Sequence, residues 1–132
     1  MMILVDTPIW SEAFRREMGA REIVDHLKRL IVAHLVGIIG PIRQEILSGV
    51  KDTRQFDLLR SDLSEFPDWE LVTGDYELAA QFFNKCRGKG IQGSNTDFLI
   101  CAISARFKAP IFTTDKDFHR FSKVLGVRLF EP

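Results

Sequence analysis

The stretch Met2-Ile3-Leu4-Val5-Asp6-Thr7-Pro8 decides the fold of this chain. Its four apolar residues predict a buried strand at residues 2–5, and an acid follows directly. Thr7 has the side chain of a helix N-cap, and Pro8 suits the first helical position, so a helix is expected to begin here. A buried strand that passes straight into a helix is typical of a parallel βαβ unit.

The rest of the chain continues this alternation of strand and helix patterns. Further strands are predicted at residues 35–39, 69–73, 110–113 and 127–130, the last of them at an edge of the sheet. Helices are predicted over about 8–18, 20–33, 40–47, 53–66, 75–87, 95–107 and 116–124. With right-handed crossovers, this order predicts an α/β fold: a three-layer α/β/α sandwich around a central, mostly parallel sheet of four to five strands.

Length and composition set broad limits. The 132 residues, 45% of them apolar, fit one domain spanning residues 1–132 with a single packed core. The formal net charge is zero, so any nucleic-acid site must rest on a local patch. Cys86 and Cys101 lack metal-type spacing and are expected to be buried free thiols. Without a signal-like start or a long apolar run, we expect a soluble, cytoplasmic protein with no membrane contact.

Four carboxylates carry the chemistry that the sequence suggests: Asp6, Glu45, Asp97 and Asp115. Each lies at or after the expected carboxyl end of a strand, or at the start of a helix. Open α/β sheets bind their ligands outside the carboxyl ends of the strands. Hard divalent cations such as Mg²⁺ prefer carboxylate and water oxygens. The pattern therefore indicates a metal site at one edge of the sheet.

Asp6 and Glu45 each have a structural alternative. Asp6 could cap the first helix, but Thr7 already suits that role, and an acid after a central strand is otherwise costly to desolvate. Glu45 could be an exposed helical residue paired with Arg43 or Lys51.

The two later acids also have structural alternatives. Asp97 could be a favourable charge in the first turn of a helix. However, Ser94 or Asn95 could cap that helix and leave Asp97 free. Between Asp115 and Asp117 we favour Asp115 as the ligand and Asp117 as the cap of the last helix.

Together, strand-Asp-Thr, Pro-x-x-x-Glu, Thr-Asp before an apolar helix and Thr-Thr-Asp-x-Asp-Phe resemble PIN-domain nucleases. The chain resembles especially the VapC toxins of prokaryotic toxin–antitoxin pairs, and the resemblance covers essentially the whole chain. The resemblance implies a ribonuclease dependent on Mg²⁺ or Mn²⁺. By the match, Asp6, Glu45, Asp97 and Asp115 are its catalytic acids, and Asp6, Asp97 and Asp115 its metal ligands. One departure is Pro8, where the family often has serine.

The leading hypothesis is thus an endoribonuclease toxin with an RNA substrate, a cognate small antitoxin and a potential homodimeric assembly. One alternative is a housekeeping PIN nuclease for RNA processing, without an antitoxin. Another is a metal-binding or RNA-binding regulatory module without catalysis. An aspartyl phosphatase fits less well, because Pro8 stands where its second acid is expected.

Two weaker patterns bear on RNA and on the antitoxin. Basic side chains could flank the site and hold RNA phosphates, although each set also fits a solvated helix face. These sets are Arg15-Arg16, Lys85-Arg87-Lys89 and Lys116-Arg120-Lys123. Trp10 and Phe14 are candidate anchors for an antitoxin tail that lies across the first helices, or else they belong to the core. Residues 88–93 lack a phosphate-binding fingerprint and are expected to form a flexible loop at the edge of the site.

Overall fold

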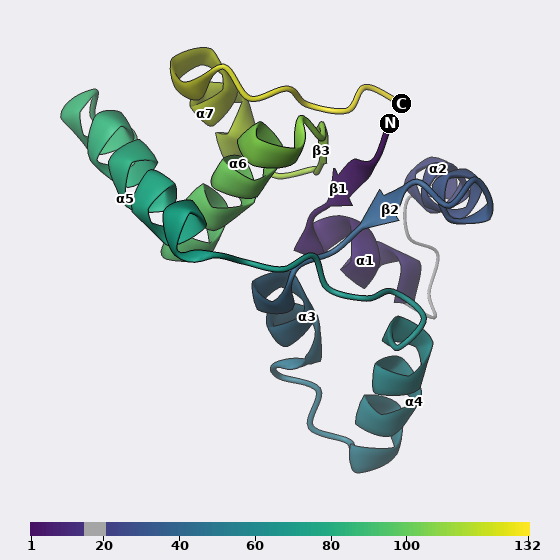
Figure 1. Ribbon diagram of the computed structural model, residues 1–132. Helices are drawn as coiled ribbons and strands as arrows, with labels where there is room; N and C mark the ends of the chain where they lie inside the picture. The colour runs from purple at the N-terminus through teal and green to yellow at the C-terminus, as the bar shows by residue number, and fades with distance from the viewer. Residues whose placement is uncertain (15–20) are drawn as a thin grey trace.

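A computed structural model describes residues 1–14 and 21–132 of the chain (Figure 1). Its strands are β1 (Ile3–Val5), β2 (Val36–Gly37) and β3 (Ile111–Phe112). Its helices are α1 (Thr7–Phe14), α2 (Arg21–Val32), α3 (Gly40–Leu47), α4 (Thr53–Leu63), α5 (Thr73–Gly88), α6 (Asn95–Phe107) and α7 (Asp117–Leu125). The predicted alternation is therefore confirmed. The predicted extension of the first helix towards Met18, and the pair Arg15-Arg16, lie outside the described residues.

The strands form a parallel sheet with the order β2-β1-β3. All three residues of β1 are buried, which is expected for a central strand covered on both faces. Leu4 pairs with Gly37 on one side and with Ile111 on the other. This register brings the ends of β1 and β3 side by side, so the segments that follow them leave the sheet at the same edge.

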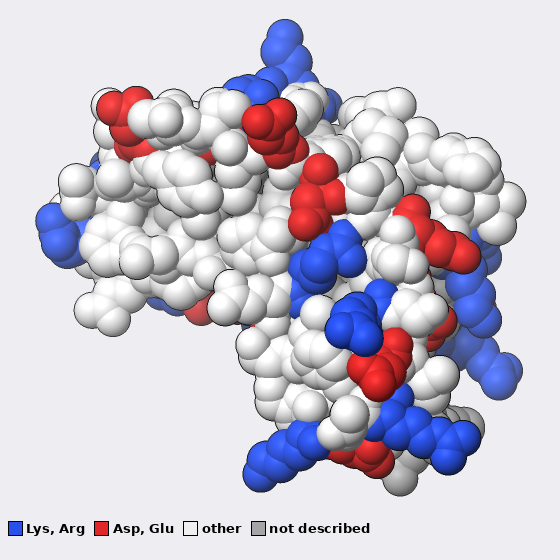
Figure 2. Space-filling model, turned by 60° about the horizontal axis from the view of Figure 1, so that its bottom comes forward, with Lys and Arg blue, Asp and Glu red and all other residues white. Residues whose placement is uncertain are grey.

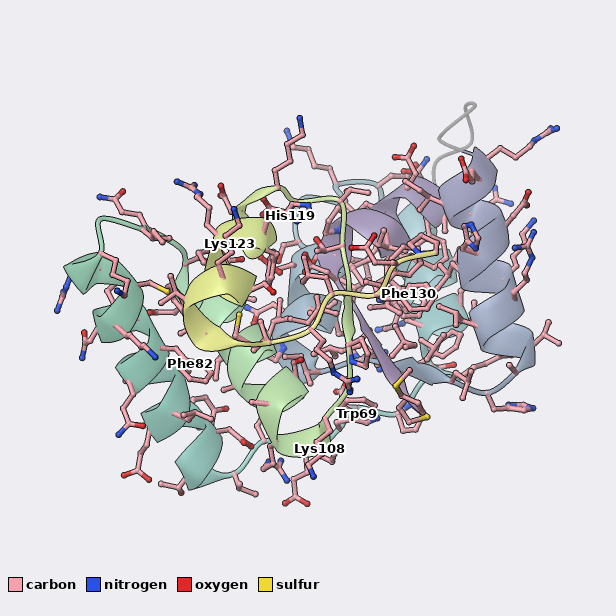
Figure 3. All side chains as sticks on the ribbon, turned by 90° about the horizontal axis from the view of Figure 1, so that it is seen from above. Trp69, Phe82, Lys108, His119, Lys123 and Phe130 are labelled. Carbon is pink, nitrogen blue, oxygen red and sulfur yellow. The ribbon has the colours of Figure 1, made fainter. Side chains whose placement is uncertain are left out.

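The sheet has three strands in the described part of the chain, not the four to five that were predicted. The segments expected to be strands at 69–73 and 127–130 contribute only single bridges, Ile38 to Asp68 and Ile111 to Leu129. The Trp69 ring packs so tightly on Gly37 that a Cβ there would lie 2.1 Å from it. Side-chain packing, rather than a continued hydrogen-bond ladder, thus holds this segment on the sheet. Figure 3 shows the C-terminal segment with Phe130 running beside β3.

Helices flank the sheet on both sides, in agreement with the predicted three-layer α/β/α fold. Figure 1 shows α5, α6 and α7 gathered on one side and α2 on the other. Helices α5 and α6 pack together extensively, and α5 also contacts α7. Arg106 near the end of α6 clamps Asp75 at the start of α5, with Nε 2.7 Å from Oδ1. This clamp fixes the position of α6, which carries Asp97 at its other end.

One predicted helix ends three residues early. The pattern predicted a helix over residues 53–66, but α4 ends at Leu63. Pro67 has no N–H to donate to Leu63 O, and the Arg43 guanidinium donates to this carbonyl at 2.9 Å and to Phe66 O instead. Both cysteines are buried and free, as predicted. No helix in the described residues is long and apolar enough to cross a membrane.

Candidate functional site

The four predicted acids share one electrostatic site at the carboxyl edge of the sheet. Asp6 follows β1, Glu45 lies on α3, Asp97 is in the first turn of α6 and Asp115 follows β3. The charges of Asp97 and Glu45 act on Asp6, and those of Asp115 and Glu45 act on Asp97. Carboxylates from four separate segments thus lie close enough to influence one another's ionisation.

Asp6 is the most enclosed of these acids, with only 5% of its surface exposed. Its Oδ1 accepts the backbone N–H of Thr7 at 2.8 Å, and its Oδ2 accepts the Thr113 hydroxyl at 2.8 Å. Burial raises the pKa of Asp6 to about 6, and the charges of Asp97 and Glu45 push it in the same direction. The two hydrogen bonds oppose this rise without cancelling it. The charged form of Asp6 at neutral pH is therefore less stable than that of an exposed aspartate.

Thr7 has a different role from the predicted one. The helix already includes Thr7, so it is not the N-cap, and it is the Asp6 carboxylate that accepts the first backbone N–H. The freed Thr7 hydroxyl donates to Glu45 Oε1 at 2.8 Å. Glu45 is exposed, and Arg43 pairs with Asp68 at 3.0 Å instead. Sequence reasoning missed Thr7 as a site residue, although the acid directly before it was the available signal.

Asp97 was expected to be free of capping contacts, but it belongs to a capping box. Ser94 Oγ accepts the Asp97 N–H at 3.0 Å, and Asp97 Oδ2 accepts the Ser94 N–H at 2.9 Å. In the described part of the chain, Oδ1 has no hydrogen-bond partner and is available for a ligand. Burial raises the pKa of Asp97 above its usual value, and Asp115 and Glu45 add to the rise.

Asp115, and not Asp117 as predicted, accepts the backbone hydrogen bond at the start of α7. Asp115 Oδ1 accepts the Asp117 N–H at 2.9 Å, which is a local turn typical of aspartate. Asp117 is the first helical residue, and its carboxylate contacts Arg120 at 2.6 Å. Asp115 therefore directs its carboxylate to the helix start while remaining in the electrostatic site.

Thr113 joins two of the acids and was also missed. Its hydroxyl oxygen accepts the Asp115 N–H at 3.0 Å while its proton goes to Asp6. The pair Thr113-Thr114 was noted in the sequence as part of a motif, but spacing alone does not show which hydroxyl turns inward.

The chemistry of the donor set fits a hard divalent cation. The gathered charges repel one another, and carboxylate oxygens are what Mg²⁺ prefers. In residues 1–14 and 21–132, however, no three His, Cys, Asp or Glu side chains converge tightly enough to form a ready-made metal cluster. The four carboxylates are close enough for their charges to interact, but not close enough for three of them to bind one ion directly. Mg²⁺ usually keeps several waters, so partial ligation through water is compatible with this looser arrangement.

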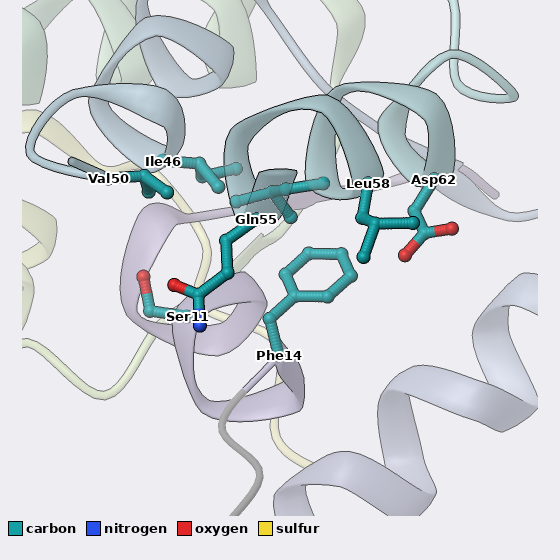
Figure 4. A pocket seen from close by; sticks show the side chains of 8 residues that line it. Ser11, Phe14, Ile46, Val50, Gln55, Leu58 and Asp62 are labelled. Carbon is teal, nitrogen blue, oxygen red and sulfur yellow. The ribbon is translucent and has the colours of Figure 1, made fainter. Parts of the chain in front are cut away.

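A groove of about 560 Å³ lies between α1 and α4, with Ile46 of α3 in its lining (Figure 4). Phe14 and Ser11 on α1 face Leu58 and Leu59 on α4 across it. Thr7, Ser11 and Phe14 are spaced to share one face of α1, so the groove leads towards the Thr7–Glu45 contact. Phe14 is 36% exposed and Leu58 53%, an unusual exposure for large apolar side chains next to a polar site.

Trp10 is not part of this surface. It is 1% exposed, and its Nε1 donates to Val5 O at 3.0 Å. The prediction of Trp10 as a partner anchor was therefore wrong, and its alternative, a core residue, is correct. Phe14 stacks near it, with ring centroids 6.4 Å apart, and remains the candidate anchor.

The chain is similar to known proteins over nearly its whole length. The family model described as PIN domain matches residues 3–124. VapC ribonuclease Mb1587 of Mycobacterium bovis and Ribonuclease VapC11 of Mycobacterium tuberculosis are each 30% identical over 132 residues, and the match covers 96% of either chain.

Two solved structures have the same fold. FitAcB from Neisseria gonorrhoeae has a TM-score of 0.80 at 20% identity, with 99% of this chain and 98% of that chain covered. VapBC2 from Rickettsia felis, bound to a DNA fragment from its promoter, has a TM-score of 0.80 at 18% identity, with 98% of each chain covered.

Proposed function

This chain belongs to the PIN-domain family, and we propose that it is a metal-dependent endoribonuclease, the toxin of a toxin–antitoxin pair. The observation that carries the proposal is the set of mutually repelling acids around Asp6, whose pKa rises to about 6. A site of this kind gains stability from a cation. Relatives named VapC ribonucleases, 30% identical over nearly the whole chain, support the RNA-cleaving reading.

We assign Asp6, Asp97 and Asp115 to hold Mg²⁺ or Mn²⁺, and Glu45 to orient the attacking water. Such an ion lowers the pKa of water and offsets negative charge on the phosphate. Thr113 holds Asp6 in place, and Thr7 fixes Glu45 Oε1, so that the other oxygen can accept a proton from the water. In the hydrolysis a bond forms between the water oxygen and phosphorus, and the bond from phosphorus to the leaving ribose oxygen breaks.

Local basic groups would hold the RNA, because the chain has no net charge. On the face drawn in Figure 2, lysine and arginine are interspersed with acids and neither sign dominates. Lys85, Arg87 and Lys89 lie at the end of α5, and Lys116 and Lys123 lie at or near the neighbouring α7. We propose that these two groups contact phosphates on either side of the cleaved bond.

The antitoxin would bind the groove at Phe14 and Leu58. An apolar segment seated there would end beside Glu45, where an arginine of the partner could reach the carboxylates and neutralise them. We also propose a cytoplasmic location, where an RNA substrate and an antitoxin would both be present. Assembly as a homodimer remains a prediction, which a solution mass measurement would check.

The enzymatic proposal is tested by incubating the purified protein with RNA in Mg²⁺, in Mn²⁺ and in EDTA. We expect cleavage with either metal, none in EDTA, and loss of cleavage in Asp6→Asn. Asp57→Asn is the matched control, because Asp57 forms an exposed ion pair with Arg60 on α4. Equal cleavage in EDTA contradicts the metal mechanism. Failure to cleave any RNA, with metal binding intact, favours the regulatory module instead.

A further inference from the structure

A small pocket of about 220 Å³ lies where α5 turns into α6, directly beside the acidic site. Its lining includes Gly93 and Phe98, which bracket the capping box of Asp97. Gly93 is followed by Ser94, whose N–H donates to Asp97 Oδ2 at 2.9 Å, and Phe98 follows Asp97. Phe98 of the pocket lining and the site acid Asp97 therefore lie in the same helical turn.

The floor of the pocket is aromatic and held firmly. Phe98 is 1% exposed and contacts Phe83 edge to face at 5.4 Å and Phe121 at 5.0 Å. A Cβ at Gly93 would lie 2.6 Å from Phe121 Cζ and 3.0 Å from Phe98 Cε2. Glycine is thus required for the loop to press against these rings. Phe98 and Phe121 fix the position of Phe83, which is only partly buried and is the lining ring that a flat ligand can reach. A ring held in place beforehand loses little entropy when a ligand stacks on it.

Polar groups line the mouth of the pocket. The Arg87 guanidinium lies 5.5 Å from the centre of the Phe83 ring, and its NH2 donates to Asn84 Oδ1 at 3.0 Å. Gln92 is exposed, and its amide has both donor and acceptor groups. A volume of about 220 Å³ is below the usual range of about 300–1,000 Å³ for larger ligands.

We propose that this pocket binds one base of single-stranded RNA, in the nucleotide next to the cleaved phosphate. The inference rests on the proposed ribonuclease function. Unstacked bases are recognised by aromatic rings, by the planar guanidinium of arginine and by side chains that read their polar edges. Phe83, Arg87 and Gln92 supply these three elements beside an acid of the cleavage site. Lys89 adds a positive charge to the same loop, which suits a polyanion better than an apolar peptide.

The test uses nucleosides, which lack phosphate and so report on the pocket independently of cleavage. Adenosine, guanosine, cytidine and uridine are titrated separately into the ¹⁵N-labelled full-length protein, and amide shifts are followed. We expect saturable shifts at Gly93 and Gln92, strongest for one nucleoside. Arg87→Ala and Gln92→Ala should each weaken that nucleoside about fivefold or more, in line with the worth of base stacking. Lys28→Ala is the control, because Lys28 is an exposed cation of α2 outside the pocket and should leave binding unchanged.

A cleavage assay on RNAs that differ at single positions completes the test. In Gln92→Ala the preference for one base at the position next to the cleaved bond should decrease. No shift at Gly93 with any nucleoside, while RNA is still cleaved, overturns the base pocket and leaves the ribonuclease standing. Nucleoside binding without cleavage of any RNA keeps the pocket and removes the enzyme. Equal weakening of nucleoside binding by Lys28→Ala contradicts base recognition.

Discussion

The Thr7 hydroxyl donates a hydrogen bond to Glu45 Oε1 at 2.8 Å and links the first turn of α1 to α3. Glu45 is exposed and belongs to a different element from the other acids, so this contact sets the direction of its carboxylate. Thr7 therefore acts as a positioning residue for the acid that we assign to the attacking water.

Thr7→Val should lower kcat much more than stability. Valine has nearly the same shape but no hydroxyl, and its backbone N–H still reaches Asp6. Loss of one exposed hydrogen bond costs about 0.5–1.5 kcal/mol at most. Thr7→Ser keeps the hydroxyl and should retain activity. Kinetics with saturating RNA separate the two variants, and equal kcat values for valine and serine would refute the positioning role.

Asp6→Asn should change how stability depends on pH. Because the folded pKa of Asp6 is raised from 3.8 to about 6, ionisation favours the unfolded chain. The stabilising effect of its proton is complete below pH 3.8 and is lost as the pH rises through 6. At about 1.4 kcal/mol per pKa unit, the loss is about 3 kcal/mol.

In EDTA, Asp6→Asn should thus gain stability relative to wild type between pH 4 and pH 7, while it loses cleavage. Urea unfolding at both values measures the change, with Asp57→Asn as the control for an exposed acid. A difference between variant and wild type that is the same at pH 4 and pH 7 argues against a strained Asp6.

Asp97→Asn tests the metal assignment directly. Asparagine keeps an acceptor for the Ser94 N–H and removes a charge whose pKa is raised by burial, so apo stability should be unchanged or higher. Mg²⁺ should stabilise wild type by about 2.7 kcal/mol at a hundredfold excess over its dissociation constant, and the variant far less.

Ser94→Ala is the complementary variant. It removes the other half of the capping box and should cost about 1 kcal/mol, yet keep the response to Mg²⁺. Denaturant melts of both variants with and without metal decide the matter. An equal metal response in Asp97→Asn and wild type would show that Asp97 is only a capping residue.

Gly37→Ala should destabilise the protein by about 1–3 kcal/mol, as overpacking usually does. A Cβ at this position would lie 2.1 Å from the Trp69 ring, which holds its segment on β2. Gly74→Ala, on α5 with open space around its Cβ position, should be neutral or mildly stabilising. Thermal melts of the pair check this, and similar melting temperatures would contradict the packing described for Trp69.

Phe14→Ala and Trp10→Ala should separate partner binding from folding. Removal of the buried Trp10 should cost about 3–5 kcal/mol of stability. Phe14→Ala should fold normally but bind the antitoxin at least about thirtyfold more weakly, as expected for an anchor worth about 2 kcal/mol. Affinity for the proposed antitoxin and melting temperature are measured together. Unchanged affinity in Phe14→Ala places the partner elsewhere.

Most of the fold followed from local patterns. A continuous apolar run ending at Asp6 predicted a central strand, and helix 95–107 was predicted with its observed bounds. What failed depended on contacts distant in sequence. Helix α4 ended at Leu63, whose carbonyl accepts a hydrogen bond from Arg43, and the segment at Trp69 packs on the sheet through its ring and a single bridge rather than through a strand ladder.

The order of strands and helices predicted that the four acids would gather at one edge of the sheet, but it did not predict their hydrogen-bond partners. Asp115 and Asp117 are chemically alike and two residues apart, so spacing did not show which would bind the helix start. Thr7 and Thr113 escaped notice because a hydroxyl reveals its role only when the facing carboxylate is placed.

Thr113 links Asp115 to Asp6 through two hydrogen bonds that run in one direction. The Asp115 peptide N–H points at its oxygen, and its own proton points at Asp6, so the three dipoles line up head to tail. Such chains polarise cooperatively, and the charge on Asp6 therefore strengthens the turn that opens α7. The start of α7 is thus coupled to the ionisation of Asp6, which lies 107 positions before Thr113 in the sequence. Neutralisation of Asp6 therefore affects both ends of the chain.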